Sequence, residues 1–418
     1  MPVLRNRAIR NSCLAGFALA GAVLGLCGPA AADETFVLKQ TITITPVAPG
    51  VVLHSFDISW VDPDVHSYFL ADRSNKAVDV IDTISKNQSK LAAGMFVGFS
   101  GNNDTSGPNG VLTIHNHGTT EVWAGDGDST VKVIDFKTGN ITHTISTNGL
   151  ERADELCYDP NEHLIVIAND AEADVTGHAP FISFIPTVGH NAYTVVKQIP
   201  FPQATNGIEQ CQWNPRNGLI YLNLPEVHGN AMDTTDGNVV VIDPRRMAVL
   251  TAFKIPVTLC AGPQGMAIGP EPQILLGCNA ASQPPGSGQN SAIMDERTGR
   301  LIKVLANAGG ADQVWFNPGD GHYLLADGSN AIQEQIAIVD ALFGRQDAPV
   351  VIAKPPGPGH AHSIAADPTR NEVYFPIPDN AGSTICPTVT SGCIAIFAPS
   401  GHDDHPVEVS DRDGDHGH

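Results

Sequence analysis

Basic residues are scarce in this chain of 418 residues. Lysine and arginine together number 23 against 44 aspartates and glutamates, so the formal net charge is -21. A surface with this excess of negative charge repels polyanions, which argues against nucleic acid and anionic membrane faces as partners. Charged residues as a whole make up only 16% of the chain, which is too few for a long helical bundle or a coiled coil.

Long hydrophobic runs are missing beyond the N-terminus. The one candidate extends from about Leu14 to Leu26, which is shorter than the ~20 residues that a membrane-spanning helix needs. Arginines precede this run, and Ala30 to Ala32 follow it at the spacing that signal peptidase prefers. The sequence therefore predicts a signal peptide over residues 1–32 and a mature chain without a membrane span, exported to the periplasm or secreted.

Several motifs of well-known chemistry are also absent. The chain has no CxxC pair, no CxxCH sequence, no GxSxG elbow and no HExxH sequence. These absences argue against a thiolate metal site, a covalently attached haem, a hydrolase of the nucleophile-elbow type and a zincin. Glycine-rich stretches such as Gly125–Gly127 lie between strand-like segments, so they indicate hairpin turns and not phosphate-binding loops.

What the chain does have is an internal repeat. Glycine (41) and proline (31) are abundant, and they separate short apolar segments. Residues 68–83 and 121–135 each read as a strand, a polar turn and a second strand that ends on Asp, which is typical of a β-hairpin. A short strand with an Asx-Pro turn precedes these hairpins, and its copies end at Pro63, Pro160, Pro215, Pro318 and Pro368, with variants at Pro270 and His117.

The spacing of these copies predicts the fold. Seven copies are separated by about 43 to 55 residues, a period typical of β-propeller blades. We therefore expect an all-β, seven-bladed β-propeller of four-stranded blades over residues 33–399. A β-sandwich or a solenoid is the alternative, but neither commonly repeats one strand-and-hairpin unit seven times. Residues 35–47 are strand-like, and we expect them to close the ring as the outer strand of the last blade.

Six cysteines remain after removal of the signal peptide, and an even number in an oxidising compartment favours disulfides. Fifteen pairings are possible, so the choice depends on the repeat. Cysteines that are close in sequence or lie in neighbouring copies are the natural partners, which gives the pairs Cys157–Cys211, Cys260–Cys278 and Cys386–Cys393.

Two of the hairpins carry a family resemblance. Residues 74–83 (SNKAVDVIDT) and 129–139 (STVKVIDFKTG) resemble the YVTN β-propeller repeat of surface-layer proteins. The resemblance extends over about residues 35 to 399 and is strong only in the first two copies. It implies an exported seven-bladed propeller. The wider group includes binding proteins, electron-transfer subunits and metal-dependent hydrolases and lyases, so the fold does not select a function.

Polar residues recur at one position of every copy. The innermost strands of a propeller converge on a channel, and ligands bind at its mouth. Counting back about six residues from each turn gives Asp57, Asn109, Asp154, Glu209, Gln264, Asp312 and His362. Neighbouring positions add His54, Arg152, Glu155, Gln210, Gln313, His360 and Ser363.

These side chains predict a metal site at the mouth of the channel. Carboxylate and amide oxygens suit Ca²⁺ or Mg²⁺, and a nearby imidazole would admit Zn²⁺ or Mn²⁺. The alternative is that the polar side chains simply face channel water. The predicted metal ligands are Asp57, Asn109, Asp154, Glu209 and Asp312, and the predicted general bases are His362 and His360.

The C-terminal residues 400–418 are polar and rich in Asp and His, which predicts a disordered tail. Its histidines could bind a metal ion weakly, or the tail could be a solvated acidic segment. The four histidines in question are His402, His405, His416 and His418.

The sequence thus leaves two functions open. The first is an exported monomeric binding protein that takes a small ligand, a divalent metal or a protein partner at the channel mouth. The alternative is a metal-dependent hydrolase or lyase, similar to lactonase-type or streptogramin-lyase-type propellers, in which His362 or His360 acts as general base. Asn109, Asp154, Glu209 and His362 are similar in type to the metal sets of those propellers. An electron-transfer subunit is less favoured because nothing in the chain supplies a redox cofactor.

Overall fold

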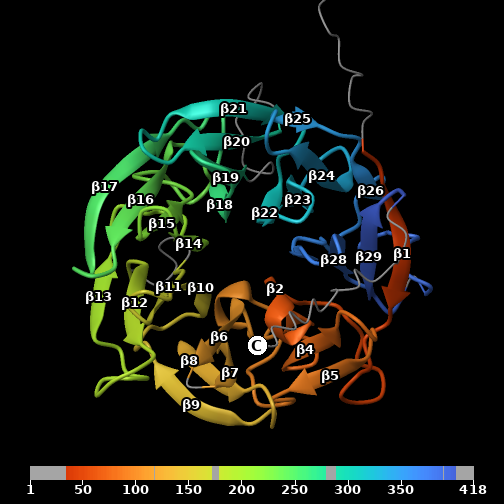
Figure 1. The fold of residues 1–418 in the computed structure, drawn as a ribbon, viewed down its shortest axis with the longest axis horizontal. Coiled ribbons are helices and arrows are strands. Elements are labelled where there is room, and N and C mark those ends of the chain that lie inside the picture. Colours follow the sequence, from red (N-terminus) through yellow and green to blue (C-terminus); the bar gives the residue numbers. More distant parts are fainter. Residues whose placement is uncertain (1–33, 117, 172–177, 279–288, 389, 402–418) are drawn as a thin grey trace, which may run out of the picture. The chain divides into compact units, whose positions relative to one another are not determined.

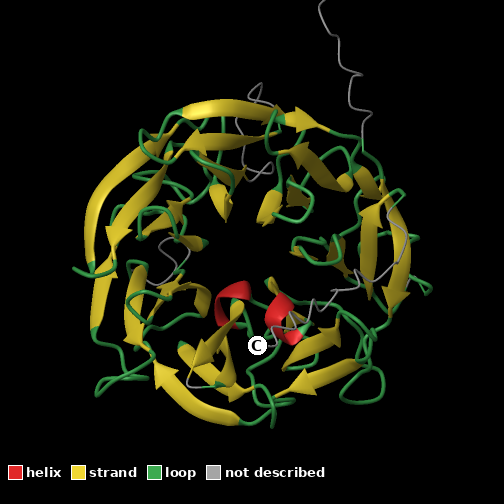
Figure 2. Cartoon of the chain, viewed as in Figure 1, coloured by secondary structure: helices red, strands yellow, loops and turns green. Residues whose placement is uncertain are grey.

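The computed structural model describes residues 34–116, 118–171, 178–278, 289–388 and 390–401. Seven antiparallel β-sheets are arranged as blades around a common axis, as Figures 1 and 2 show. Within the described ranges, helix is confined to two 3₁₀ turns, η1 (Pro63–Val65) and η2 (Asn103–Thr105). The predicted all-β, seven-bladed propeller of four-stranded blades is confirmed.

The strands follow one another from the axis outward in the first six blades. Blade 1 comprises β2 (Ser59–Asp62), β3 (Ser67–Asp72), β4 (Ala77–Asp82) and β5 (Gln88–Leu91), and blade 2 comprises β6 (Val111–Asn116), β7 (Thr119–Gly125), β8 (Thr130–Asp135) and β9 (Ile141–Ser146). Blade 3 comprises β10 (Ala153–Asp159), β11 (Leu164–Asn169), β12 (Phe181–Pro186) and β13 (Lys197–Pro200).

Blade 4 comprises β14 (Cys211–Asn214), β15 (Leu219–Leu224), β16 (Gly237–Asp243) and β17 (Ala248–Ile255). Blade 5 comprises β18 (Pro263–Ile268), β19 (Gln273–Cys278), β20 (Asn290–Asp295) and β21 (Leu301–Ala306). Blade 6 comprises β22 (Ala311–Asn317), β23 (His322–Asp327), β24 (Glu334–Asp340) and β25 (Arg345–Gln346), with β26 (Val350–Ala353) also pairing with β24.

The N-terminal strand closes the ring. Blade 7 consists of β27 (Ala365–Asp367), β28 (Glu372–Ile377), β29 (Cys393–Pro399) and, on the outside, β1 (Phe36–Ile42). β1 runs antiparallel to β29, with Phe36 opposite Pro399 and Ile42 opposite Ile394. Pairing of the two ends of the chain removes the open edges that an unclosed array of blades would present. The ring closure expected from the strand-like N-terminal segment is therefore observed.

Burial follows the position of a strand within its blade. Every residue of the second strands β3, β11, β23 and β28 is buried, because both faces of these strands pack against neighbouring blades. The outer strand β17 is mostly exposed. The core is therefore divided into clusters between blades; Tyr68 of blade 1, for example, stacks on Tyr374 of blade 7 at 4.9 Å between ring centroids.

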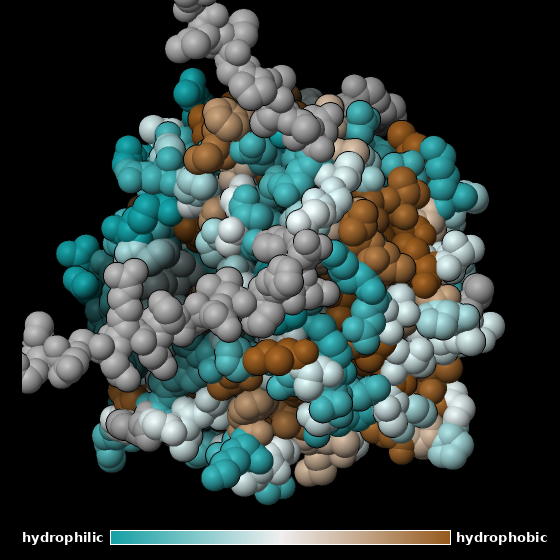
Figure 3. Space-filling view, turned by 45° about the vertical axis from the view of Figure 1, so that its right-hand side comes forward, coloured by the Kyte–Doolittle hydropathy of each residue, from teal (hydrophilic) through white to brown (hydrophobic). Residues whose placement is uncertain are grey.

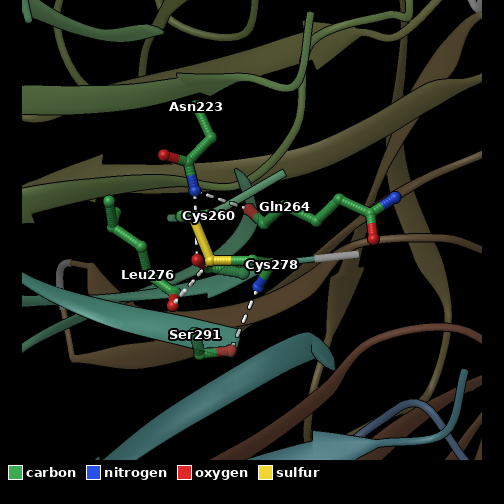
Figure 4. The surroundings of a disulfide bond; sticks show 7 residues. Asn223, Cys260, Gln264, Leu276, Cys278 and Ser291 are labelled. Carbon is green, nitrogen blue, oxygen red and sulfur yellow. Dashed lines mark hydrogen bonds between the residues drawn. A yellow bond between two sulfur atoms is a disulfide. The ribbon is translucent and has the colours of Figure 1, made fainter. Parts of the chain in front are cut away.

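All three predicted disulfides are present, with Cα–Cα distances of 5.2 to 5.7 Å. One joins the inner strands of blades 3 and 4, one joins the connection between β17 and β18 to the end of β19 in blade 5, and one joins the connection between β28 and β29 to the first residue of β29. Figure 4 shows the blade 5 bridge, beside which Ser291 Oγ accepts a hydrogen bond from the backbone N–H of Cys278. Three disulfides are consistent with an extracellular protein. The bridges are Cys157–Cys211, Cys260–Cys278 and Cys386–Cys393.

The surface mixes hydrophilic and hydrophobic residues, as Figure 3 shows for one face. On β1, Val37 is 40% exposed and Leu38 is 45% exposed. No helix in the described part of the chain is long and apolar enough to cross a membrane. The predicted signal peptide (1–32) and the predicted tail from residue 402 onward lie outside the described residues, so both stay predictions.

His322, at the start of β23, lies among several charged groups. Its Nε2 is 3.2 Å from Asp347 Oδ2 and 3.6 Å from Glu34 Oε2, and its Nδ1 is 3.4 Å from Asp320 Oδ1. Arg345 faces the same carboxylate of Asp347 at 3.1 Å. Burial by itself lowers the pKa of His322, but the surrounding carboxylates outweigh it and the net shift of the pKa is upward.

The free energy of unfolding is therefore expected to fall as the pH rises through the folded-state pKa of His322. A raised pKa means that the folded protein holds the proton more tightly than the unfolded chain. The resulting stability is fully present below the unfolded pKa, near 6.5, and is lost above the folded-state pKa. Urea unfolding at a series of pH values should show a shallower decline for His322→Gln than for the wild type. If the free energy of unfolding of the two proteins changes with pH in the same way, His322 does not cause the decline.

Candidate functional site

The loops that enter the inner strands meet at one mouth of the ring. There they line a cavity of about 270 Å³. Six of the seven equivalent positions predicted from the repeat line it: Asp57, Asp154, Glu209, Gln264, Asp312 and His362. Asn109 lies beside the cavity, where its side-chain oxygen accepts hydrogen bonds from Arg73 and its amide donates to the carbonyl of Ala153.

Backbone pairing explains why these positions are equivalent. The N–H groups of Asp57, Asn109 and Glu209 each donate to the second strand region of their own blade, at Ala71, Gly125 and Asn223 respectively, with N···O distances of 2.8 to 3.0 Å. Each of these residues comes two positions before an inner strand, so its side chain reaches the same level of the mouth.

β-bulges present additional side chains at the mouth. The pairing of inner and second strands shifts by one residue between Ala153 and Leu156, and again between Ala311 and Val314. A bulge leaves one residue unpaired and turns the strand locally. In blade 3 the result is that both Asp154 and Glu155 line the cavity.

Arg73 neutralises one side of the mouth. It lies in the turn between β3 and β4 and is only 3% exposed. Its guanidinium donates to Asp57 Oδ2 at 2.7 Å, to Asn109 Oδ1 at 2.7 Å and to Asn103 Oδ1 at 3.1 Å. Burial raises the pKa of Asp57, but Arg73 and His362 outweigh burial and hold that pKa at about 2. Arg73 was not predicted as a site residue, because in the sequence it is one polar residue of a hairpin turn.

Arg152 neutralises a second part of the mouth. Its Nε donates to Asp154 Oδ2 at 2.7 Å and its Nη2 donates to Asp170 Oδ2 at 2.6 Å. Asp104 lies 3.6 Å from Nη1. Burial raises the pKa of Asp154 to about 6, although Arg152 acts in the opposite direction. Asp57 and Asp154 are thus both held by arginines.

Three further carboxylates have no such partner. One oxygen each of Glu155, Glu209 and Asp312 lies within 4.8 Å of the others. Glu155 is 4% exposed and Glu209 is 5% exposed, and both line the cavity. Among the described residues, no hydrogen bond or ion pair reaches these three carboxylates. Burial, followed by repulsion from neighbouring carboxylates, raises the pKa of both glutamates well above the usual value.

His362 completes the mouth from blade 7. Its Nδ1 is 2.9 Å from the backbone carbonyl oxygen of His360, and its ring stacks on Phe56 at 4.9 Å. Its Nε2 faces Asp57 Oδ1 at 3.7 Å. Burial lowers the pKa of His362, but Asp57 and Asp312 outweigh this effect and raise it. His360 also lines the cavity, and there burial lowers its pKa.

Other predicted site residues lie elsewhere or could not be placed. His54 lines the cavity but its Nδ1 is 2.7 Å from Asp379 Oδ1. The four tail histidines proposed as metal ligands lie outside the described residues. A separate group of Asp62, Asp64 and His115 also has ligand atoms within 4.8 Å of one another. In that group, Asp62 Oδ2 already accepts a hydrogen bond from Thr113.

Comparisons with known proteins support the fold and go no further. No protein-family model and no curated protein matches the sequence. A chain in the solved structure named "Crystal Structure of Mitotic Checkpoint Complex" is similar in fold, with a TM-score of 0.58 at 12% identity. The match covers 92% of this chain and 98% of that chain. This likeness shows a shared seven-bladed propeller fold. The YVTN resemblance therefore stays a prediction from two hairpins.

Proposed function

We propose that this protein is an exported binding protein that holds a divalent cation at the mouth of its propeller. The observation that carries the proposal is the group formed by Glu155, Glu209 and Asp312. Two of these carboxylates are more than nine-tenths buried and lack any partner among the described residues. A buried charge without a partner is costly, so such a group is usually protonated or bound to a cation.

The donor set indicates which cation fits. All three donors are carboxylate oxygens, which suit Ca²⁺, Mg²⁺ or Mn²⁺ better than a softer metal. They come from blades 3, 4 and 6, so closed-ring packing holds their spacing. A cavity of about 270 Å³ is larger than a single hydrated ion requires. The bound cation would therefore have open positions for a small anionic ligand or for a carboxylate of a protein partner.

Replacing Glu209 by glutamine tests this function. We expect Ca²⁺ or Mn²⁺ at about 100 times its dissociation constant to stabilise the wild type by about 2.7 kcal/mol, and Glu209→Gln to lose most of this gain. Without metal, the variant should be at least as stable as the wild type because one repelling buried carboxylate is gone. Urea unfolding with and without each metal measures both effects.

Glu271→Gln is the matched control for this experiment. Glu271, in the turn before β19, forms an exposed ion pair with Arg297, and neither residue lines the cavity. This variant should keep the whole metal-dependent gain. Equal gains in the wild type and in Glu209→Gln would show that the cation binds elsewhere, for instance at the histidines of the tail.

A metal-dependent hydrolase or lyase is the second candidate function. His360 and His362 line the same cavity as the three carboxylates, so an imidazole would stand near a metal-polarised ester or lactone oxygen. Metal-dependent turnover of a panel of lactones and esters, lost in His360→Ala with metal binding retained, would establish this activity. If the protein binds metal but turns over no member of the panel, cation binding is the one function of the two that remains supported.

A further inference from the structure

Two groups of possible metal ligands meet at Asp312. One is the carboxylate group of Glu155, Glu209 and Asp312, and the other consists of Asp57, Asp312 and His362. In each group the ligand atoms lie within 4.8 Å of one another. A carboxylate has two oxygens, so one aspartate can bind two ions at once. Asp312 therefore stands where a bridging ligand between two ions would stand.

The ring of His362 is oriented as in metal-bound histidines. A backbone carbonyl can only accept, so the 2.9 Å contact with the carbonyl of His360 places the ring proton on Nδ1. In the neutral ring that a metal ion requires, Nε2 carries its lone pair toward Asp57. Metal-binding histidines characteristically donate their other ring N–H to a carbonyl or carboxylate in this way. Stacking on Phe56, with 11° between the two ring planes, holds the His362 ring in this orientation.

The distance between His362 and Asp57 is also within a few tenths of an ångström of the spacing between two ligands of one ion. Their closest atoms, Nε2 and Oδ1, are 3.7 Å apart, which is too long for a hydrogen bond. Two ligands bonded to one ion at about 2.1 Å lie roughly 3 to 3.5 Å apart. Arg73 occupies only Oδ2 of Asp57, so Oδ1 remains available on the side of His362.

The charge balance of the mouth favours more than one divalent cation. Five carboxylates line the cavity, and Asp104 and Asp170 lie against Arg152 behind it. Among the described residues at the mouth, the guanidinium groups of Arg73 and Arg152 are the permanent cations that offset these seven carboxylates, which leaves five formal negative charges. One divalent cation would offset two of the five, and two cations would offset four.

We infer that the mouth binds a pair of divalent cations bridged by Asp312, with the second ion held by Asp57 and His362. This inference rests on the proposed cation site at Glu155 and Glu209. Bridged ions in proteins lie about 3.5–4 Å apart. The carboxylate position suits Ca²⁺, Mg²⁺ or Mn²⁺, and the position with imidazole suits Mn²⁺ or Zn²⁺, so Mn²⁺ fits both. His362 is then a metal ligand, and His360 is the imidazole that remains for a general base.

Mn²⁺ provides a test that separates this pair from isolated sites. The full mature chain, with its four tail histidines replaced by alanine, is equilibrated with Mn²⁺, and bound metal is counted. Electron paramagnetic resonance is recorded on the same sample. We expect two equivalents of Mn²⁺ and an exchange-coupled signal, because coupling requires a shared ligand. One equivalent with an uncoupled signal would overturn the pair and retain the proposed function. Absence of bound Mn²⁺ would overturn the pair, and absence of bound Mn²⁺, Ca²⁺ and Mg²⁺ would overturn both.

Three variants locate the two ions. His362→Gln should lower the stoichiometry from two equivalents to one and abolish the coupled signal. Glu209→Gln should also lower the stoichiometry to one equivalent and abolish the coupled signal, because it removes the ion held by the carboxylate group. Asp312→Asn should weaken the binding of both ions. Glu271→Gln, at a residue that does not line the cavity, should retain two coupled ions. Circular dichroism checks that each variant folds. Two coupled ions in His362→Gln would overturn the assignment of the second position.

Discussion

Replacing Arg152 by methionine is expected to destabilise the folded protein by about 3–5 kcal/mol. The Arg152 side chain is 7% exposed, and its guanidinium donates to both Asp154 and Asp170, whose side chains are almost fully buried. Methionine fills a similar volume but leaves these carboxylates without their cation. The penalty for an uncompensated buried charge exceeds what the ion pair itself contributes. Urea unfolding of the metal-free wild type and variant measures the difference.

Arg245→Met is the control for this prediction. Arg245 pairs with Glu162 at 2.7 Å, but its side chain is 72% exposed, so the loss should stay below about 1 kcal/mol. The double variant Arg152→Met with Asp154→Asn should recover part of the lost stability, because one uncompensated charge is then removed. Similar losses in Arg152→Met and Arg245→Met would mean that the mouth stays hydrated and that its charges need no arginine.

The fold was predictable from the sequence because its signals are local. Each hairpin places polar turn residues between apolar strands, and each Asx-Pro turn fixes the end of an inner strand, so the period can be read along the chain. The disulfides followed from the same repeat. Cys157 and Cys211 both lie in the inner strands of neighbouring blades, one position apart in the repeat, and closure of the ring brings these strands together.

The position of the channel mouth was predictable from the sequence. Which of its carboxylates are paired with arginines was not. Counting from the turns found the level at which Asp57 and Glu209 lie, because that level is fixed by backbone pairing within a blade. Counting did not find Arg73, which reaches the mouth from a hairpin turn and contacts a residue of the next blade. It named Glu155 only as a neighbour, because the bulge that places Glu155 in the cavity leaves no distinct sequence pattern.

Loss of the Cys157–Cys211 bridge is expected to destabilise the protein by about 4 kcal/mol. In the chain-entropy description, a cross-link stabilises by restricting the unfolded chain, and the effect grows with the number of residues enclosed. This bridge spans 54 residues, whereas Cys386–Cys393 spans 7. Replacing both cysteines of a pair by alanine should therefore cost about 1.8 kcal/mol more for the longer loop. Equal losses in the two double variants, measured by urea unfolding, would rule out this explanation.

The same bridge also lies only two residues along each chain segment from the proposed cation site. Glu155 precedes Cys157 by two residues and Glu209 precedes Cys211 by two residues, so the disulfide joins the two inner strands just where their carboxylates repel each other. Without the bridge, the two carboxylates can move apart, and the affinity for Mn²⁺ should fall by about 10- to 100-fold, as for other changes to residues that orient metal ligands. The Cys386/Cys393 double variant should bind Mn²⁺ like the wild type. Unchanged affinity after loss of Cys157–Cys211 would show that packing between blades 3 and 4 alone holds the carboxylates together.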